Sequence, residues 1–340
     1  MTAPLVVVDA DVLGRQRTGD ETYVLNLLRH LPDAAEGRLR FVAITRRPDL
    51  VPEGVEPLQV PARLQELRMA WSVPSVLRTL RPALAHFQHV LPLTCPCPAV
   101  VTIHDLSFER DASTMPLHER LVFTTMVPRS ARRAAHVLAV SERTKADIVE
   151  LYAIPQAKIA VTPHGVGPAF TPGADSLGEY VLLVGSVEAR KNPLAAADAA
   201  SAVGLPIVVA GPVRDSGLAR ELERSGASLR GYVTQDELID LYRGAACLVM
   251  PSRYEGFGLP VLEAMACGIP VVAASDPALR EVAGDAAIFV AVDELAEGIR
   301  QALAERERLV AAGLERARHF TWETTARRTV DVYLDVLGLA

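Results

Sequence analysis

The sequence predicts an α/β protein with two domains, each built on a doubly wound parallel sheet. Three observations carry this prediction. The chain has 340 residues, more than one hydrophobic core usually serves, so two domains of about 150 residues are expected. Short apolar runs typical of buried strands alternate with helical segments in both halves. A stretch rich in proline and glycine, residues 164–173, separates the halves and marks the domain boundary.

Composition and charge exclude several classes of protein. The chain is 50% hydrophobic and 22% charged, which is ordinary for a packed α/β protein and excludes extended disorder. Its formal net charge of -6 disfavours binding to nucleic acid. The spacing of the cysteines does not suit a zinc site, so we expect four reduced thiols: Cys95, Cys97, Cys247 and Cys267.

The N-terminal residues are typical of a strand and not of a secretory leader, because Asp9 and Asp11 interrupt the apolar run that begins at Pro4. No stretch approaches the roughly 18 continuous apolar residues that a membrane span needs. We therefore expect a cytoplasmic protein, with the inner face of the membrane as the alternative location.

The first domain is expected to open with a strand at residues 5–8, a loop, and a helix over 19–31. After strands at 41–45 and 55–60, residues 65–80 are expected to form a helix that carries Arg68, Arg78 and Arg81. One interpretation of this helix is a basic amphipathic face that meets a lipid-linked acceptor or an anionic membrane. The other is an ordinary surface helix, which Pro74 and the acidic chain favour.

A histidine and an aspartate follow the strand expected at residues 100–103. Enzymes with α/β sheets place catalytic groups at the carboxyl ends of strands. His104 and Asp105 are therefore candidate site residues. The alternative is a capping aspartate beside a half-buried histidine.

The second domain is expected to open with a strand at 180–184 that runs into Gly185. Arg190 and Lys191 then precede Pro193, which is suited to the first turn of a helix. Cations and free backbone donors at a helix start are suited to binding an anionic group such as a phosphate. The alternative interpretation is that Arg190 and Lys191 are solvated surface residues without a ligand.

Residues 251–268 hold the most informative stretch, P-S-R-Y-E-G-F-G-L-P-V-L-E-A-M-A-C-G. A buried strand is expected at 245–250, a turn-rich loop at 251–258, and a helix at 259–267 that Gly268 closes. Glu255 lies in the loop at the strand's carboxyl end, and Glu263 lies one turn into an apolar helix, where an ionised group needs a partner. Gly256 and Gly258 allow backbone N–H groups to approach a ligand.

This stretch resembles the donor-site motif of glycosyltransferase family 4. The resemblance rests on Glu255 and Glu263 with seven residues between them, within E-G-F-G-L-P-x-L-E-A and before C-G-x-P-V. It implies a retaining enzyme of the GT-B fold, in which two Rossmann-like domains flank a cleft. Residues 1–168, with a crossover helix in 322–340, would form the acceptor-side domain, and residues 169–321 would bind the nucleotide-sugar donor.

The resemblance also implies roles for single residues. In the family the loop R-T-G-D-E-T-Y closes over the donor phosphates, V-T-I-H-D-L places its histidine against the sugar, and G-x-V offers backbone atoms to the nucleobase. Glu21 and Ser186 depart from the pattern, since many relatives have glycine at the first position and some have arginine at the second. The implied catalytic residues are Glu255, His104, Arg190 and Lys191, and the implied donor-binding residues are Gly19, Gly185, Arg190, Lys191, Gly231, Tyr232, Val233, Glu255, Gly256, Phe257, Gly258, Leu259 and Glu263.

By this resemblance the chain is a hexosyltransferase, most similar in its motifs to bacterial mannosyltransferases of polysaccharide synthesis. Mannose from GDP-mannose is the first choice of donor, and a glycan or lipid-linked sugar is the expected acceptor. UDP-glucose or another nucleotide sugar is the alternative donor, and a non-catalytic sugar-binding protein or a GT-B epimerase is a less favoured function. Retention by double displacement needs a carboxylate nucleophile, and Asp105 is the sole and weak candidate for one. We therefore prefer a route in which the acceptor attacks the same face of the sugar that the diphosphate leaves. No cofactor or metal is expected, weak peripheral membrane association is open, and the oligomeric state is not predicted.

Overall fold

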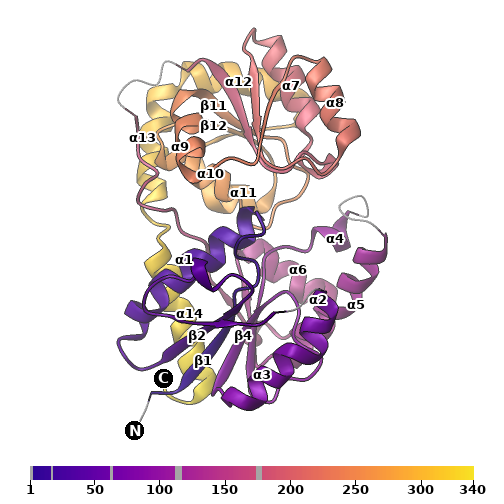
Figure 1. The fold of residues 1–340 in the computed structure, drawn as a ribbon. Coiled ribbons are helices and arrows are strands. Elements are labelled where there is room, and N and C mark those ends of the chain that lie inside the picture. The colour runs from indigo at the N-terminus through magenta and orange to yellow at the C-terminus, as the bar shows by residue number, and fades with distance from the viewer. Residues whose placement is uncertain (1–2, 17, 62–63, 112–116, 174–177) are drawn as a thin grey trace. The chain divides into compact units, whose positions relative to one another are not determined.

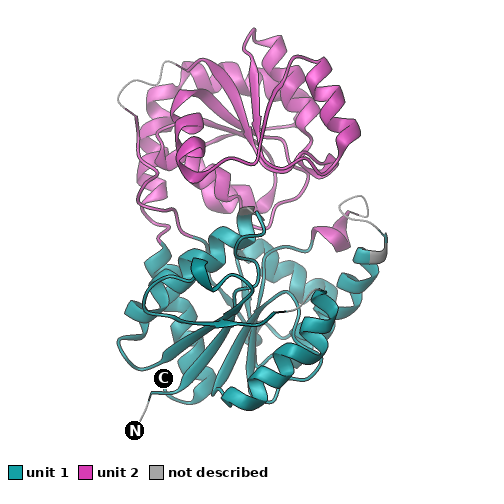
Figure 2. Cartoon of the chain, viewed as in Figure 1, with its two compact units in different colours: residues 1–106, 117–164, 322–340 teal, residues 107–116, 165–321 magenta. Residues whose placement is uncertain are grey.

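The computed structural model describes residues 3–16, 18–61, 64–111, 117–173 and 178–340. Its contacts divide the chain into two compact units, shown in Figure 2. Unit 1 holds residues 1–106, 117–164 and 322–340, and unit 2 holds residues 107–116 and 165–321. The division after residue 164 falls inside the proline- and glycine-rich stretch. The short segment around α4 (Ser107–Arg110) groups with unit 2, although the sequence placed it in the first domain.

Unit 1 is built on a parallel sheet of seven strands in the order β3-β2-β1-β4-β5-β6-β7. The strands are β1 (Leu5–Asp9), β2 (Arg40–Thr45), β3 (Glu56–Gln59), β4 (Leu84–Gln88), β5 (Ala99–Ile103), β6 (His136–Ala139) and β7 (Ile159–Val161). The α-helices are α1 (Thr18–Ala35), α2 (Gln65–Leu67), α3 (Val73–Leu80), α5 (Leu117–Arg133), α6 (Glu142–Tyr152) and α14 (Trp322–Leu337). The last helix returns to unit 1 and packs against α1, as the yellow ribbon in Figure 1 shows.

Unit 2 repeats the architecture with six parallel strands in the order β10-β9-β8-β11-β12-β13. The strands are β8 (Tyr180–Val184), β9 (Ile207–Ala210), β10 (Ser228–Gly231), β11 (Ala245–Met250), β12 (Val271–Ala274) and β13 (Ile288–Val290). The remaining helices are α7 (Pro193–Ala202), α8 (Ser216–Arg224), α9 (Gln235–Gly244), α10 (Leu259–Ala266), α11 (Pro277–Ala283), α12 (Leu295–Ala304) and α13 (Arg306–Ala317).

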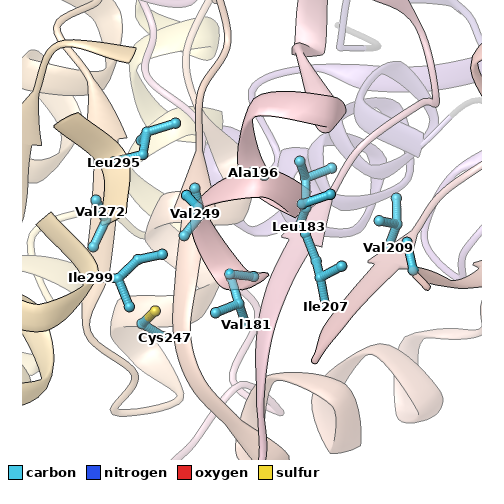
Figure 3. Packing of buried hydrophobic residues seen from close by; sticks show 14 of the residues in the cluster. Val181, Leu183, Ala196, Ile207, Val209, Cys247, Val249, Val272, Leu295 and Ile299 are labelled. Carbon is cyan, nitrogen blue, oxygen red and sulfur yellow. The ribbon is translucent and has the colours of Figure 1, made fainter. Parts of the chain in front are cut away.

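The core of unit 2 explains why its central strands, such as β8 and β11, are continuous apolar runs. A parallel sheet covered by helices on both faces must bury both sets of alternating side chains. Figure 3 shows Val181 and Leu183 of β8 beside Val249 of β11, with Leu295 and Ile299 of α12 packed in the same cluster. The doubly wound α/β fold expected from the sequence is confirmed in both units.

Each sheet has a point where the strand order reverses, between β1 and β4 in unit 1 and between β8 and β11 in unit 2. Doubly wound sheets bind ligands outside the carboxyl ends of the strands at this point. Loops that leave these strands are therefore where each unit can hold a ligand.

The helix expected over residues 65–80 is confirmed, but a π turn interrupts its α-helical geometry. The segment is split into α2, a π turn η2 (Arg68–Ser72) and α3, with Pro74 in the first turn of α3, where its missing N–H is tolerated. The Arg68 guanidinium is fully buried and binds the Asp9 carboxylate, with Nη2–Oδ1 at 2.6 Å and Nη1–Oδ2 at 3.1 Å. Arg68 therefore belongs to the interior and not to a basic surface.

Candidate active site

The donor-side residues of unit 2 lie on two loops at the strand-order reversal. One loop leaves β8 through Gly185 and forms the turn η5 (Ala189–Lys191), and the other leaves β11 and leads into α10. Because β8 and β11 are neighbouring parallel strands, their carboxyl ends meet at one edge. Segments more than 60 residues apart in the chain, around Lys191 and Glu255, thus come together.

Glu255 and Lys191 form the closest ion pair of this edge. Lys191 Nζ lies 2.6 Å from Glu255 Oε1, and Arg190 Nη1 lies 3.6 Å from Glu255 Oε2. The side chain of Glu255 is only 8% exposed, so burial alone would raise its pKa. The neighbouring lysine and arginine outweigh that effect and hold the pKa of Glu255 below its usual value. The carboxylate is therefore ionised at neutral pH.

Arg190 joins the loop after β8 to the loop after β11 through hydrogen bonds. Its Nη1 donates to the carbonyl oxygen of Tyr254 at 2.7 Å, and its Nη2 donates to Glu188 Oε1 at 2.8 Å. The Arg253 backbone N–H in turn donates to the Arg190 carbonyl at 3.0 Å. These bonds tie the β8 loop to the β11 loop and fix the position of both cations beside Glu255.

The start of α10 depends on Gly258. This residue has φ +104°, and a Cβ there would lie 2.5 Å from Leu279 Cδ2, so both backbone conformation and space require glycine. The Glu255 N–H donates to Asp276 Oδ2 at 3.3 Å, while Asp276 Oδ1 caps α11 by accepting from Ala278 N–H at 2.8 Å. Asp276 thus positions the loop, a role that its S-D-P setting at a helix start could have indicated.

Glu263 has the partner that the sequence required of a buried carboxyl group. Tyr242 of α9 donates its hydroxyl to Glu263 Oε2 at 2.8 Å. Burial dominates and raises the pKa of Glu263 to about 7, although the tyrosine bond opposes the shift. In the described residues Oε1 has no hydrogen-bond partner of its own, so it can accept from a ligand hydroxyl.

The other predicted donor-binding residues of unit 2 follow strands or the β11 loop. Gly185 directly follows β8 and lies against the Lys191 side chain, and Gly231 ends β10 with φ +64°. Tyr232 is exposed, and Val233 and Leu259 are half-buried. Phe257 is buried and packs edge-on to Phe320 at 6.0 Å, so its ring serves the interior of unit 2. Gly256 is also buried.

Gly211 is a residue that sequence reasoning missed. A Cβ there would lie 2.1 Å from the Gly185 carbonyl oxygen, so glycine is needed where the ends of β8 and β9 approach. The Gly211 N–H donates to the Gly231 carbonyl at 2.8 Å. Three glycines therefore shape the strand ends where the predicted phosphate and base contacts lie.

Unit 1 holds the other two predicted residues, His104 and Gly19. His104 follows β5, is buried, and its Nε2 lies 2.9 Å from Gln88 Oε1. The Tyr23 ring packs edge-on to it at 4.8 Å. Burial dominates and lowers the pKa of His104 to about 4, so the ring is neutral at pH 7. Gly19 lies in the first turn of α1, and a Cβ there would meet no described atom within 4 Å.

Family models match nearly the whole chain. A model described as Glycosyltransferase Family 4 matches residues 17–170, and one described as Glycosyl transferases group 1 matches residues 171–319. The O-antigen chain mannosyltransferase B of Escherichia coli is 30% identical over 265 residues, which cover 69% of this chain and 70% of the relative. The chain belongs to glycosyltransferase family 4. It is a transferase, as its motifs predicted.

A second relative and two solved structures are also similar to the family 4 chain. The D-inositol 3-phosphate glycosyltransferase of Nocardiopsis dassonvillei is 31% identical over 240 residues, which cover 59% of this chain and 56% of that protein. Sucrose-phosphate synthase from Thermosynechococcus elongatus shares the fold with a TM-score of 0.79 at 19% identity, covering 99% of this chain and 100% of the other. Anabaena Alr3699/HepE in complex with UDP and glucose has a TM-score of 0.75 at 15% identity, and the match covers 98% of this chain and 100% of the other. The two-domain GT-B fold is confirmed.

Among the described residues, no helix is both long and apolar enough to cross a membrane.

Proposed function

We propose that this family 4 enzyme transfers a hexose from a nucleotide diphosphate sugar to an acceptor hydroxyl with retention at the anomeric carbon. The observation that carries the proposal is the buried Glu255 carboxylate, held 2.6 Å from Lys191 Nζ at the reversal of strand order in unit 2. This pair places two kinds of group side by side. An ionised carboxylate accepts from sugar hydroxyls, and an ammonium group attracts the diphosphate.

In the proposed reaction the bond between the anomeric carbon and the diphosphate oxygen breaks, and the acceptor oxygen bonds to the same face of that carbon. The leaving diphosphate accepts the proton of the acceptor hydroxyl. Lys191 and Arg190 stabilise the negative charge that develops on the diphosphate. Glu255 holds sugar hydroxyls, Glu263 holds the ribose hydroxyls, and neutral His104 contacts the sugar.

Two further groups of residues complete the proposed donor site. Gly231, Tyr232 and Val233 offer backbone atoms to the nucleobase, and Gly19 approaches the phosphates. Because Lys191 and Arg190 supply the positive charge that a metal ion provides in other transferases, the reaction needs neither metal nor other cofactor.

GDP-mannose is the first choice of donor. The name of the Escherichia coli relative, an O-antigen chain mannosyltransferase, and the motifs of residues 251–268 support it. The acceptor would then be a growing polysaccharide or lipid-linked sugar. UDP-glucose or another nucleotide sugar is the second choice, which the Anabaena complex with UDP and glucose supports.

A lipid-linked acceptor would fit weak peripheral attachment to a membrane at its cytoplasmic face. Leu64, Leu67 and Trp71 lie at helical spacing before α3, with side chains 56%, 52% and 71% exposed. These side chains, rather than the arginines of the same segment, would enter the interfacial region of a bilayer. Replacing Trp71 by serine is expected to reduce co-sedimentation with liposomes of mixed anionic lipid. Equal sedimentation of both proteins would remove the membrane from the proposal.

Incubation with a panel of nucleotide sugars tests the function directly. The purified protein is offered GDP-mannose, UDP-glucose and related donors, with and without acceptor extract, and released nucleotide is measured. Release from one donor supports transfer and identifies that donor. Binding without release would indicate a sugar-binding protein, and an altered sugar still attached to its nucleotide would indicate an epimerase.

A further inference from the structure

A group of three metal-ligating side chains lies at the reversal of strand order in unit 1, whereas the two cations that the proposed reaction assigns to the diphosphate, Arg190 and Lys191, belong to unit 2. Asp20 lies in the first turn of α1, His89 directly follows β4, and His104 directly follows β5. One ligand atom from each lies within 4.8 Å of the other two. The proposed chemistry uses His104 alone of the three, and only as a sugar contact.

The hydrogen bonds of His104 determine which nitrogen is available. Gln88 Oε1, 2.9 Å from Nε2, can only accept, so Nε2 carries the ring proton and Nδ1 carries a lone pair. Nδ1 faces Asp20 Oδ1 at 4.0 Å. A lone pair and a carboxylate that face each other repel, unless a cation or a proton donor lies between them.

His89 adds a second unsatisfied group. Its Nδ1 is buried and has no hydrogen-bond partner among the described residues. The His89 and His104 rings are 5.2 Å apart and tilted by 49°, so they are not stacked against each other. A buried ring nitrogen without a partner is costly, and coordination of a metal ion would satisfy it together with His104 Nδ1 and the Asp20 carboxylate.

We propose that Asp20, His89 and His104 bind one divalent transition-metal ion of the Zn²⁺ type. Two imidazoles and one carboxylate are a ligand set that such ions take, and three protein ligands leave one position for water. Gln88 serves as the outer partner that orients the His104 ring. Bond lengths of about 2.0–2.2 Å require the three side chains to approach each other slightly.

The ion has a predicted effect on the reaction, and this part rests on the proposed function. With its Nδ1 on the metal, His104 is no longer free to contact the sugar, so the bound ion inhibits transfer. The site is thus a regulatory one and not a requirement of the chemistry. Binding itself does not depend on the donor or on activity.

Chelator-treated full-length protein titrated with Co²⁺ and Zn²⁺ alone tests the binding. We expect one ion per chain by calorimetry and visible Co²⁺ absorption without a thiolate charge-transfer band. Asp20→Asn, whose side chain is partly exposed and keeps its shape, and His89→Gln should each weaken Zn²⁺ binding about 100-fold or more, while Gln88→Leu should weaken it about 10- to 100-fold. His319→Gln, an exposed histidine of unit 2, is the matched control and should bind as the wild type does.

Three results would overturn the proposal, provided that circular dichroism shows folded variants. The first is no binding at millimolar metal. The second is binding that survives both Asp20→Asn and His89→Gln. The third is a thiolate band that Cys97→Ser removes, which would assign the ion to the pair Cys95–Cys97, whose sulfurs lie 3.8 Å apart.

The inhibition is measured separately, with the donor that the nucleotide-sugar panel identifies. Saturating Zn²⁺ should slow turnover at least tenfold in the wild type and leave Asp20→Asn unaffected at the same concentration. Turnover unchanged in metal-loaded wild type would overturn the regulatory part. Failure of every donor would count against the proposed function and leave the binding result intact.

Discussion

Two buried carboxyl groups of one short stretch, Glu255 and Glu263, have pKa values shifted in opposite directions. Both lose hydration, which raises a carboxyl pKa. Glu255 has Lys191 and Arg190 beside it, which reverse the shift, while Glu263 has a neutral tyrosine hydroxyl, which does not. Glu255 and Glu263 are the same residue type and are similarly buried. The side chains next to each one therefore determine whether it presents a charged or a neutral group to a ligand.

The raised pKa of Glu263 predicts a pH-dependent stability. The folded state keeps the proton up to about pH 7, whereas the unfolded chain releases it near the ordinary glutamate pKa of 4.5. Stability from this group is therefore fully present below the unfolded pKa and falls as pH rises through the folded pKa. Relative to Glu263→Gln, the wild-type free energy of unfolding should fall by about 2 kcal/mol between pH 5 and 7.5. Urea denaturation at both pH values checks this, and parallel changes in the two proteins would contradict it.

Lys191 is predicted to stabilise the diphosphate that leaves the donor sugar. Lys191→Gln removes one of the two charges that stabilise it, so kcat should fall about 100-fold. Lys145→Gln, on α6 of unit 1, is the matched control and should keep the wild-type rate. A Lys191 variant with wild-type kcat would show that the ammonium only neutralises Glu255.

Two glycines at helix starts, Gly258 and Gly19, differ in whether the local structure requires glycine. Gly258 precedes α10 with positive φ and no room for a Cβ, whereas Gly19 in α1 has open space around it. Gly258→Ala should cost about 1–3 kcal/mol of stability. Gly19→Ala should leave stability unchanged or slightly higher.

The Gly19→Ala variant therefore isolates function from folding. If the family role of Gly19 holds, its kcat/KM for the donor should fall while its melting temperature stays at the wild-type value. Thermal unfolding and steady-state kinetics on both glycine variants check these expectations. Wild-type kinetics in Gly19→Ala would remove Gly19 from the donor site.

Arg68 gives a prediction about the segment between β3 and β4. Replacing it by methionine leaves the Asp9 carboxylate buried without its main partner, which should cost about 3–5 kcal/mol. Arg78→Met, exposed in the last turn of α3, should change stability by less than about 0.5 kcal/mol. Denaturant unfolding of the two variants separates an interior ion pair from a surface charge, and equal small effects would contradict the burial of Arg68.

The sequence predicted elements better than side-chain partners. Runs such as residues 245–250 and the glycines around α10 carry local information, so the strands and the loop with Glu255 could be located. The bond between Arg68 and Asp9 spans 59 residues and depends on a π turn that no periodicity indicates. Likewise, Tyr242 reaches Glu263 from another helix, and the meeting of Asp20, His89 and His104 depends on strand order.

At the scale of the whole molecule, the two units repeat one architecture and each uses its own reversal of strand order. Unit 2 gathers a carboxylate, two cations and glycine-shaped strand ends there. Unit 1 gathers two histidines and an aspartate. The C-terminal helix α14 returns the chain to unit 1, where Trp322 and Tyr333 are buried. Cleavage near the linker should therefore leave unit 1 incomplete.

In the proposed reaction Glu255, fixed by Lys191 and Arg190, holds the donor sugar. The most direct measurement is kcat/KM of Glu255→Gln for the donor that the panel identifies, beside its melting temperature. We expect kcat/KM to fall about tenfold or more, because a buried hydrogen bond to a charged group is lost in the transition state. An unchanged kcat/KM in a folded Glu255→Gln protein would contradict it.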